Sequence, residues 1–392
     1  MTAAITAARL GKSVLLIERN ERLGRKLAIT GKGRCNVTNN CSAEEALANV
    51  PRNAKFLYGA FAKFPPSETM AFFEELGAPL KTERGKRVFP VSDKAGDVVA
   101  ALERELRRLD VKTAHEKALS LIIDDNVCRG VKTSAGEHFA RSVIVAAGGK
   151  SYPKTGSDGS GYALAKRAGH TVIEPAPSLV PLVTEEKWVK SACGLTLKNT
   201  AMKLLDGEKT VYEDFGEVAF TADGLGGATI LSASAHISEM KRGRYSVILD
   251  LKPALSAEKL DARLLREFSE NRGKPFGEAL RKLLPSELCG AFSEITGIPS
   301  DKKIDEITKT ERKTLLNTLK NLRLNIRDFR PLDEAIITRG GIKTSEISPK
   351  TMESRLVKGL FFAGEIIDVD AYTGGFNLQI AFSTGKLAGE NA

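Results

Sequence analysis

The sequence predicts an α/β fold that is divided by a large insertion. Three short apolar runs occur, at 12–19, 143–149 and 359–365. Such runs are typical of strands that are buried on both faces of a parallel sheet. Between the last two runs the pattern changes, first to short alternating strands punctuated by Gly and Asp, then to charged, helix-type periodicity. The expected domains are an outer α/β domain (1–180 and 331–392), an inserted β-barrel or sandwich (181–255) and a helical domain (256–330).

The remaining elements of the outer domain follow from local signals. The first residues read as a helix tail that ends at a glycine, and a strand follows it. Further helices are expected at 45–50, 67–77, 95–109 and 376–389, a hairpin at 80–92, and a β-meander through 111–149. Residues 256–330 are expected to be almost wholly helical, and residues 331–354 return to extended chain.

Composition narrows the class of protein. The chain has 392 residues, 42% of them hydrophobic, and no apolar run approaches the roughly 20 residues that a membrane helix requires. Five cysteines form an odd, sparse set that suits a reducing compartment, so we expect a cytoplasmic protein without a metal site. The net charge of 59 − 49 = +10 comes mostly from bases interleaved with acids. One local concentration stands out: Arg19, Arg22, Arg25, Lys26, Lys32 and Arg34.

Glu18 ends the first predicted strand, after a helix and a glycine turn. In a dinucleotide-binding βαβ unit an acid at this place binds ribose hydroxyls, although a solvent-facing strand end is an equally good interpretation. The preceding strand and the G-x-G-x-x-G loop of such a unit are absent from the sequence. We therefore expect that the chain begins at an internal methionine of a longer product, with a genuine variant that binds no cofactor as the alternative.

Other glycine-rich segments are weighed in the same way. Two of them, 11–13 and 149–151, carry the G-K-S ending of a P-loop but lack its first glycine, and 156–161 is more typical of a flexible helix entry. The stretch 31-GKGRCN-36 is a stronger candidate, because two glycines let the backbone approach a flat ligand amid positive charge. Near the end, 370-DAYTGGFNLQ-379 places an acid before a Gly-Gly pair that opens a helix.

Together these segments resemble the bacterial NAD(P)/FAD-dependent oxidoreductase family of BaiN/YhiN-like and aminoacetone oxidase-like flavoproteins. The matching stretches run from one end of the chain to the other: LLIERNERLGRKLAITGKGRCNVTN, VIVAAGGKSYPKTGSDGSGYALA, TRGGIKTSEISPKTMESR and GLFFAGEIIDVDAYTGGFNLQIAFSTG. GKGRCNVTN and YTGGFNLQIAFSTG are the most specific of them. The resemblance implies a Rossmann-like FAD-binding domain interrupted by an inserted barrel and a helical domain.

The resemblance also implies roles for particular residues. Glu18 would bind the adenosine ribose, with Arg25 and Lys26 close by. The cofactor-binding residues implied elsewhere are Gly33, Arg34, Cys35 and Asn36 along the flavin and pyrophosphate, Ala118 at adenine, Gly148 near the ADP moiety, Gly364, Glu365 and Asp370 at the ribityl and phosphates, and Gly375, Phe376, Asn377 and Leu378 at the flavin pyrimidine edge.

The expected function is that of an FAD-dependent oxidoreductase. A reductant, for which NAD(P)H is one candidate, would deliver hydride to the flavin, and a small organic substrate or O₂ would reoxidise it. Two departures from the family matter: the first Gly-rich loop is missing, and Ala222-Asp223 stands where many members carry a histidine. No catalytic acid or base can be named, and neither the substrate nor the oligomeric state follows from the sequence.

Three alternatives remain open. Cys35 and Cys41 could form a redox disulfide beside the flavin, although simple packing of Cys35 is the favoured role. The +10 charge admits a flavin-dependent RNA-modifying or RNA-binding protein, but nucleic acid is the less favoured partner. The missing loop admits a non-catalytic binding module.

Overall fold

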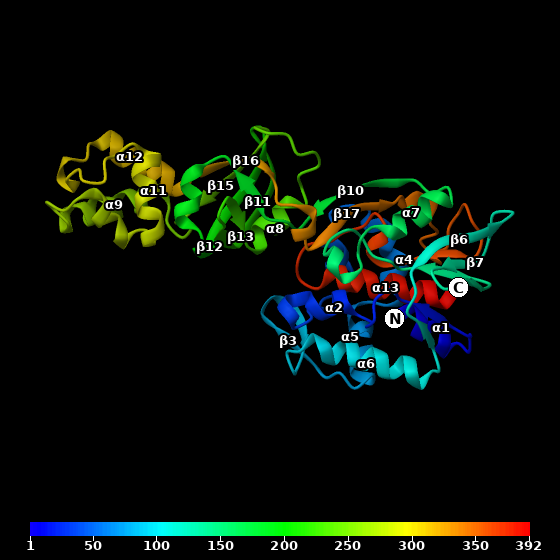
Figure 1. Cartoon of the computed structure of the whole chain (residues 1–392). Helices are drawn as coiled ribbons and strands as arrows, with labels where there is room; N and C mark the ends of the chain where they lie inside the picture. Colours follow the sequence, from blue (N-terminus) through cyan, green and yellow to red (C-terminus); the bar gives the residue numbers. More distant parts are fainter. The chain divides into compact units, whose positions relative to one another are not determined.

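The computed structural model describes residues 1–392, which form two compact units. Unit 1 comprises Met1–Ser178 and Pro331–Ala392, and unit 2 is the intervening segment Leu179–Arg330 (Figure 1). The interrupted α/β architecture predicted from the sequence is therefore present, and each unit contains its own hydrophobic core.

Unit 1 contains the parallel strands of a Rossmann-like fold. β1 (Leu15–Ile17) pairs with β5 (Lys112–Ala114), and β9 (Val143–Val145) pairs with β18 (Leu360–Phe362). β18 is fully buried, as predicted, but β1 is not: Leu15 is 40% exposed.

Smaller sheets and helices surround these strands. The meander consists of β6 (Ala118–Asp124), β7 (Val127–Thr133) and β8 (Glu137–Phe139). The predicted hairpin consists of β3 (Leu80–Glu83) and β4 (Arg87–Pro90), and β2 (Thr38–Asn39) extends it. A further pair is formed by β10 (Val172–Ser178) and β17 (Ile337–Ile342). The helices are α1 (Thr2–Arg9), α2 (Arg25–Ile29), α3 (Ala43–Ala48), α4 (Tyr58–Lys63), α5 (Pro66–Glu75), α6 (Ala95–Arg108), α7 (Ser160–Arg167) and α13 (Phe376–Asn391). α13 packs against α1 and α4, which brings the two chain ends near each other (Figure 1).

Unit 2 is built on a closed six-stranded barrel. Its strands follow the order β11 (Leu182–Thr184), β14 (Gly224–Gly226), β13 (Lys209–Phe220), β12 (Thr196–Asp206), β15 (Tyr245–Asp250) and β16 (Leu322–Phe329). The short helix α8 (Ala228–Ser234) packs against β13. Closure leaves no exposed sheet edge.

The helices of unit 2 are α9 (Ala257–Glu270), α10 (Phe276–Ala279), α11 (Ser286–Thr296) and α12 (Lys309–Lys320). The expectation of helix through residue 330 is wrong at its end, because β16 closes the barrel there. Leu322, Leu324 and Ile326 are buried and alternate with charged or polar residues, which is the period of a strand. One hydrophobic core includes residues of both the barrel and the helices.

Candidate cofactor site

The carboxyl ends of the parallel strands in unit 1 lead into loops that contact one another. Glu18 directly follows β1, the segment 146–159 follows β9, and Glu365 lies three residues beyond β18. Side-chain hydrogen bonds and ion pairs join all three loops. In open α/β sheets ligands bind outside the carboxyl ends of the strands, so this is the candidate site.

Glu18 is held by its own turn. Its Oε1 accepts hydrogen bonds from the backbone N of Asn20 (2.9 Å) and from Asn20 Nδ2 (2.6 Å). Asn20 Nδ2 also donates to the Thr155 carbonyl oxygen (3.1 Å), and Arg25 donates to Asn20 Oδ1 (2.8 Å). One oxygen of Glu18, Oε2, has no hydrogen bond, so the half-buried carboxylate can still accept a hydrogen bond from a ligand hydroxyl.

A second tie between these loops is ionic. Arg19 pairs with Asp158, which lies in the loop before α7. Burial raises the pKa of Asp158, but hydrogen bonds from Arg19 and Ser160 outweigh it and lower this pKa to about 2. Asp158 is therefore charged at neutral pH and holds the loop against the end of β1.

Glu365 is the centre of a network between four segments. Its Oε2 accepts from Lys26 Nζ (2.5 Å), and its Oε1 accepts from Ser151 Oγ (3.0 Å) and from the backbone N of Thr338 (2.9 Å). Thr338 Oγ1 in turn accepts from the backbone N of Lys150 (2.7 Å) and of Ser151 (3.0 Å). The side chain of Glu365 is only 11% exposed, so its charge is compensated by Lys26 within the fold.

The chain after β9 passes close to this network because two glycines allow it. A Cβ on Gly149 would lie 2.4 Å from Thr338 Oγ1 and 2.7 Å from Glu365 Oε1. Gly148 has φ +73, and a Cβ there would lie 3.0 Å from Ser157 Oγ. That hydroxyl is buried and has no hydrogen-bond partner.

The segment 30–36 turns sharply at Gly31 and Gly33, both with positive φ. A Cβ on Gly33 would meet nothing within 4 Å, so this backbone faces open space. Cys35 is fully buried and unpaired, and burial raises its pKa to about 12. A thiol of that kind is a poor nucleophile at neutral pH, which favours the packing role over the redox disulfide. The next residue, Asn36, has a buried Oδ1 without a partner.

The N-terminus of α13 lies against β2, which follows the 30–36 segment. A Cβ on Gly375, which has φ +102, would stand 2.4 Å from the Thr38 carbonyl oxygen. Asn377 fixes the entry by bonding both the N (2.8 Å) and the O (2.7 Å) of Ala371. Phe376 is buried, and Leu378 packs beside the core that includes Cys35.

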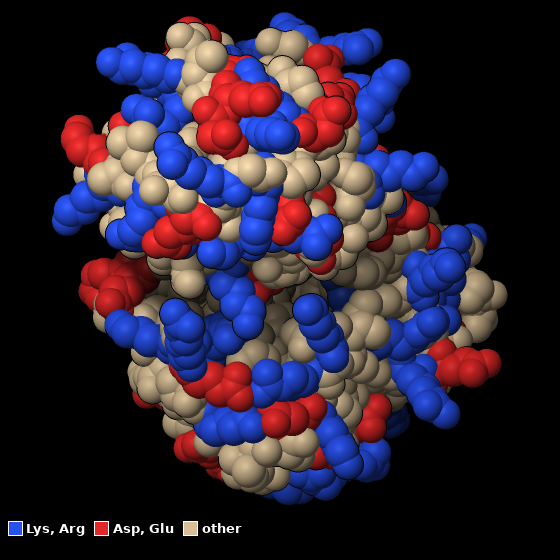
Figure 2. Space-filling model, turned by 90° about the vertical axis from the view of Figure 1, so that its left-hand side faces the viewer, with Lys and Arg blue, Asp and Glu red and all other residues tan.

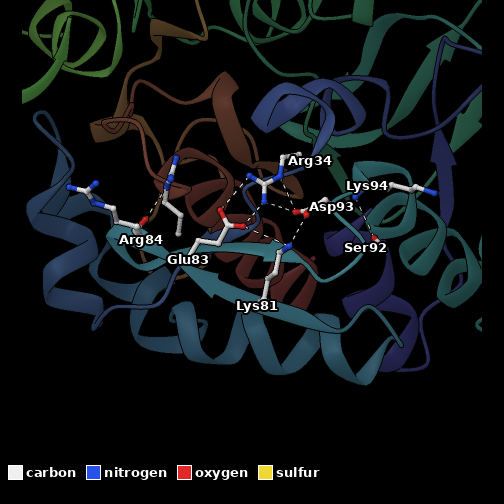
Figure 3. Close-up of polar contacts among 8 residues, drawn as sticks. Arg34, Lys81, Glu83, Arg84, Ser92, Asp93 and Lys94 are labelled. Atoms are coloured by element: carbon white, nitrogen blue, oxygen red, sulfur yellow. Dashed lines mark hydrogen bonds and ion pairs between the residues drawn. The ribbon is translucent and has the colours of Figure 1, made fainter. Parts of the chain in front are cut away.

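Arg34 is bound by the β3–β4 hairpin. Its guanidinium pairs with Glu83 and Asp93 on and beside the β3–β4 hairpin, both at 2.5 Å, and stacks 4.1 Å from the centre of the Phe89 ring. Lys81 completes the cluster by pairing with Asp93 (2.6 Å) (Figure 3). Arg34 thus joins the 30–36 segment to the hairpin.

The remaining predicted residues, Asp370, Gly364 and Ala118, contact other parts of unit 1. Asp370 is 1% exposed and committed to Arg52 (2.5 Å) and Ser178 Oγ (2.7 Å). Gly364 is buried, and its N donates to Thr384 Oγ1 (3.0 Å). Ala118 begins β6 in the meander, opposite Thr133 of β7, and packs against the core of unit 1.

Sequence reasoning missed Ser151, Thr338 and Ser157. The signal for Ser151 was present, since G-K-S directly follows a buried strand, but it was weighed only as a P-loop. Tyr162 on α7 was also missed. Its hydroxyl is buried without a partner, and burial, followed by the charges of Glu365 and Asp368, raises its pKa.

Comparison with known proteins decides the family. The profile described as "HI0933-like protein Rossmann domain" matches residues 1–391. The chain belongs to this HI0933-like family. The resemblance seen in the sequence is thereby confirmed, and the chain is an FAD-dependent oxidoreductase with the Rossmann-like fold of flavoproteins.

Named relatives of this HI0933-like protein fall into two kinds. A 3-dehydro-bile acid delta(4,6)-reductase of Clostridium scindens is 35% identical, covering 100% of this chain and 96% of the relative. A ribosomal RNA dihydrouridine synthase of Haemophilus influenzae is 29% identical, covering 97% and 92%. Among solved structures, a quinol-fumarate reductase with menaquinol aligns with TM-score 0.51 at 16% identity, covering 99% of this chain and 68% of that one, and shows the fold alone.

The residues of this HI0933-like protein fit FAD. The test is the pair of buried polar atoms without partners, Asn36 Oδ1 and Ser157 Oγ, which lie at the end of the 30–36 segment and in the loop that follows β9. Glu18 keeps a free carboxylate oxygen for a ribose hydroxyl, and the backbone at Gly33 is open to a flat ligand. No group of three or more His, Cys, Asp or Glu residues could hold a metal ion, and none of the helices combines the length and apolarity needed to span a bilayer.

Proposed function

We propose that this protein reduces a carbon–carbon double bond conjugated with a carbonyl group. The observation that carries the proposal is the chemistry shared by the two kinds of named relative. A delta(4,6)-reductase acting on a 3-dehydro bile acid saturates an alkene in conjugation with the 3-ketone. A dihydrouridine synthase saturates the alkene of uracil, which is conjugated with the ring carbonyl. Both reactions add hydride to the electron-poor carbon of an activated alkene.

Residues of unit 1 would hold the cofactor from three sides. Glu18 would accept hydrogen bonds from the ribose hydroxyls of the adenosine part, and Arg25 would fix the turn after β1 through its hydrogen bond to Asn20. Asn36 and Ser157 would satisfy their buried polar atoms on the cofactor. Gly375 would bring the first turn of α13 close enough for its N–H groups to face the pyrimidine edge of the flavin.

When bound and reduced, FAD supplies the hydride for the reaction. The protein must then polarise the pyrimidine edge of the flavin ring and hold its own charged side chains in fixed positions. The α13 N-terminus favours negative charge near it because its backbone N–H groups are not used within the helix. Lys26 is neutralised by Glu365, so it contributes orientation rather than a mobile charge. NAD(P)H is our candidate reductant, entering before the organic substrate.

The test uses the flavin-loaded protein without oxygen. The holoenzyme is reduced with NADPH, NADH or dithionite in parallel, and a 3-oxo-4,6-diene steroid is then added while the visible flavin spectrum is followed. We expect reoxidation by the conjugated dienone and none by the matched saturated 3-ketone. A flavin that stays reduced after the dienone is added, or that the saturated ketone reoxidises equally, would contradict the proposal, and preparations that never hold flavin would favour the binding module.

An RNA substrate is the second candidate. Relatives that are 29% and 26% identical along nearly the whole chain are ribosomal RNA dihydrouridine synthases, and this chain carries a net charge of +10. Figure 2 shows basic side chains spread over the visible face with acidic side chains among them, rather than one uninterrupted basic surface. Because binding to phosphates falls steeply with salt, an RNA substrate predicts a strong salt dependence of the affinity for an rRNA fragment. Salt-independent, weak binding would exclude it.

A further inference from the structure

The tip of the β3–β4 hairpin carries arginines that no acid neutralises. Arg84 and Arg87 are exposed, and neither forms an ion pair with a carboxylate. Arg87 donates through Nε to the Arg84 carbonyl oxygen (3.1 Å), which leaves the outer edge of its guanidinium available. Gly85 between them has φ +75 and lets the turn close.

The nearby acids are already committed. Glu83 and Asp93 are taken by Arg34 and Lys81, two bases against two acids, so this inner cluster is neutral. Figure 3 shows Arg84 extending away from this cluster. The charge at the tip is therefore not balanced by the residues that anchor the hairpin.

The anchoring is firm, so the tip has a defined position. Arg34 binds two acids and stacks on Phe89, and Arg87 approaches the same ring, with its guanidinium carbon 5.7 Å from the ring centre. A guanidinium held in one place loses less conformational entropy when it binds a ligand.

The tip lies beside the N-terminus of α13. Asn39, which is 5% exposed, donates from Nδ2 to the Gly85 carbonyl oxygen and to the Gly374 carbonyl oxygen, both at 3.1 Å. One side chain therefore joins the hairpin turn to the Gly-Gly pair that opens the helix. The arginines stand next to the place where the proposed function puts the pyrimidine edge of the flavin.

We propose that Arg84 and Arg87 recognise an anionic oxygen group of the substrate, a carboxylate or a phosphate. This inference rests on the proposed function for its location but not for its chemistry. Guanidinium forks match the two oxygens of either group, and they bind them with charge-assisted hydrogen bonds. The substrate is thus an activated alkene that carries an acidic group at a distance from the double bond.

The test compares Arg84→Ala/Arg87→Ala with a control of equal charge loss, Arg107→Ala/Arg129→Ala, whose side chains are exposed and unpaired elsewhere in unit 1. For the carboxylate source, the probes are a 3-oxo-4,6-diene steroid carboxylic acid and its methyl ester. We expect the hairpin variant to lose roughly 10-fold of the preference for the acid over the ester, corresponding to about 1.4 kcal/mol.

For the phosphate source, the probes are oligouridylate and uridine. We expect the salt slope of oligouridylate binding to fall by roughly 1 to 2 in the hairpin variant alone.

Both arms are measured as equilibrium binding to the oxidised holoenzyme as well as in turnover. A protein that binds the acid through the hairpin without reducing it would overturn the proposed function and leave the anion site supported. The anion site is overturned if neither the acid preference nor the salt slope changes, or if the control variant changes them equally.

Discussion

Gly149 is a position where one added methyl group should destabilise unit 1 at the candidate site. A Cβ there would lie 2.4 Å from Thr338 Oγ1, 2.7 Å from Thr338 Cβ and 2.7 Å from Glu365 Oε1. Ordinary contacts between heavy atoms are about 3.5 Å or longer, so the Thr338 side chain must move by roughly 1 Å. Its hydroxyl would then lose the hydrogen bonds from the backbone N of Lys150 and Ser151.

The magnitude combines two costs. Overpacking of a close-packed site costs about 1–3 kcal/mol. Each of the two hydrogen bonds contributes about 0.5–1.5 kcal/mol. We therefore expect Gly149→Ala to lower the free energy of unfolding of unit 1 by about 4 kcal/mol. The control is Gly96→Ala in α6, where a Cβ meets nothing within 4 Å and φ is not positive, so stability should stay the same or rise by up to about 1 kcal/mol.

The assay separates the two units in one urea titration. Release of bound flavin reports on unit 1, whereas the only tryptophan, Trp188, lies in the core of unit 2 and reports on the barrel by its fluorescence. Gly149→Ala should shift the flavin transition to lower urea and leave the Trp188 transition in place. The steric reasoning is refuted if the flavin transition of Gly149→Ala coincides with that of Gly96→Ala, or if both transitions of Gly149→Ala move together.

Three further outcomes are expected. Hydrogen bonds from Arg108, followed by Arg9, lower the pKa of Glu105 to about 2 against burial. The stability that this carboxylate contributes is therefore present above its unfolded pKa of about 4.3 and is lost as the pH falls toward 2. Glu105→Gln should flatten the pH dependence of the urea midpoint in that window, and an unchanged slope would contradict this. Exposed Cys193 should supply the fast phase of thiol labelling in the native protein. Cys35, whose pKa burial raises to about 12, should react only on unfolding. Persistence of the fast phase in Cys193→Ser would contradict the assignment of that phase to Cys193. Glu18→Gln should weaken FAD binding roughly 10-fold in a flavin-fluorescence titration, whereas exposed Glu21→Gln should not, and equal affinities would remove Glu18 from the site.

The sequence predicted those parts of the fold whose signals are local. The hairpin at 80–92 and the helix after the Gly-Gly pair follow from turn residues and helix-capping glycines, and both are present. The strand β16 was missed because its segment follows a long charged helical region, although its own alternation of buried and polar residues has the period of a strand. Its partners β11 and β15 lie far away in the chain.

The site shows the same division between local and distant information. The position of Glu365 just beyond a strand is readable from the sequence, but its partner Lys26 lies 339 residues away. Asp370 reads locally as a ligand before a helix, yet the fold buries it against Arg52 and Ser178. Pairings of this kind depend on which strands become neighbours, and no periodicity in the chain records that.

The closed barrel has a consequence for how such a protein changes over generations. Its first strand, β11, and its last strand, β16, are hydrogen-bonded partners, with Leu182 opposite Phe329. The segment 179–330 therefore begins and ends about one strand spacing apart, roughly 5 Å. In unit 1 the flanking strands β10 and β17 are likewise paired, with Ser178 opposite Ile337. A whole module can therefore be exchanged between such adjacent ends without stretching the host.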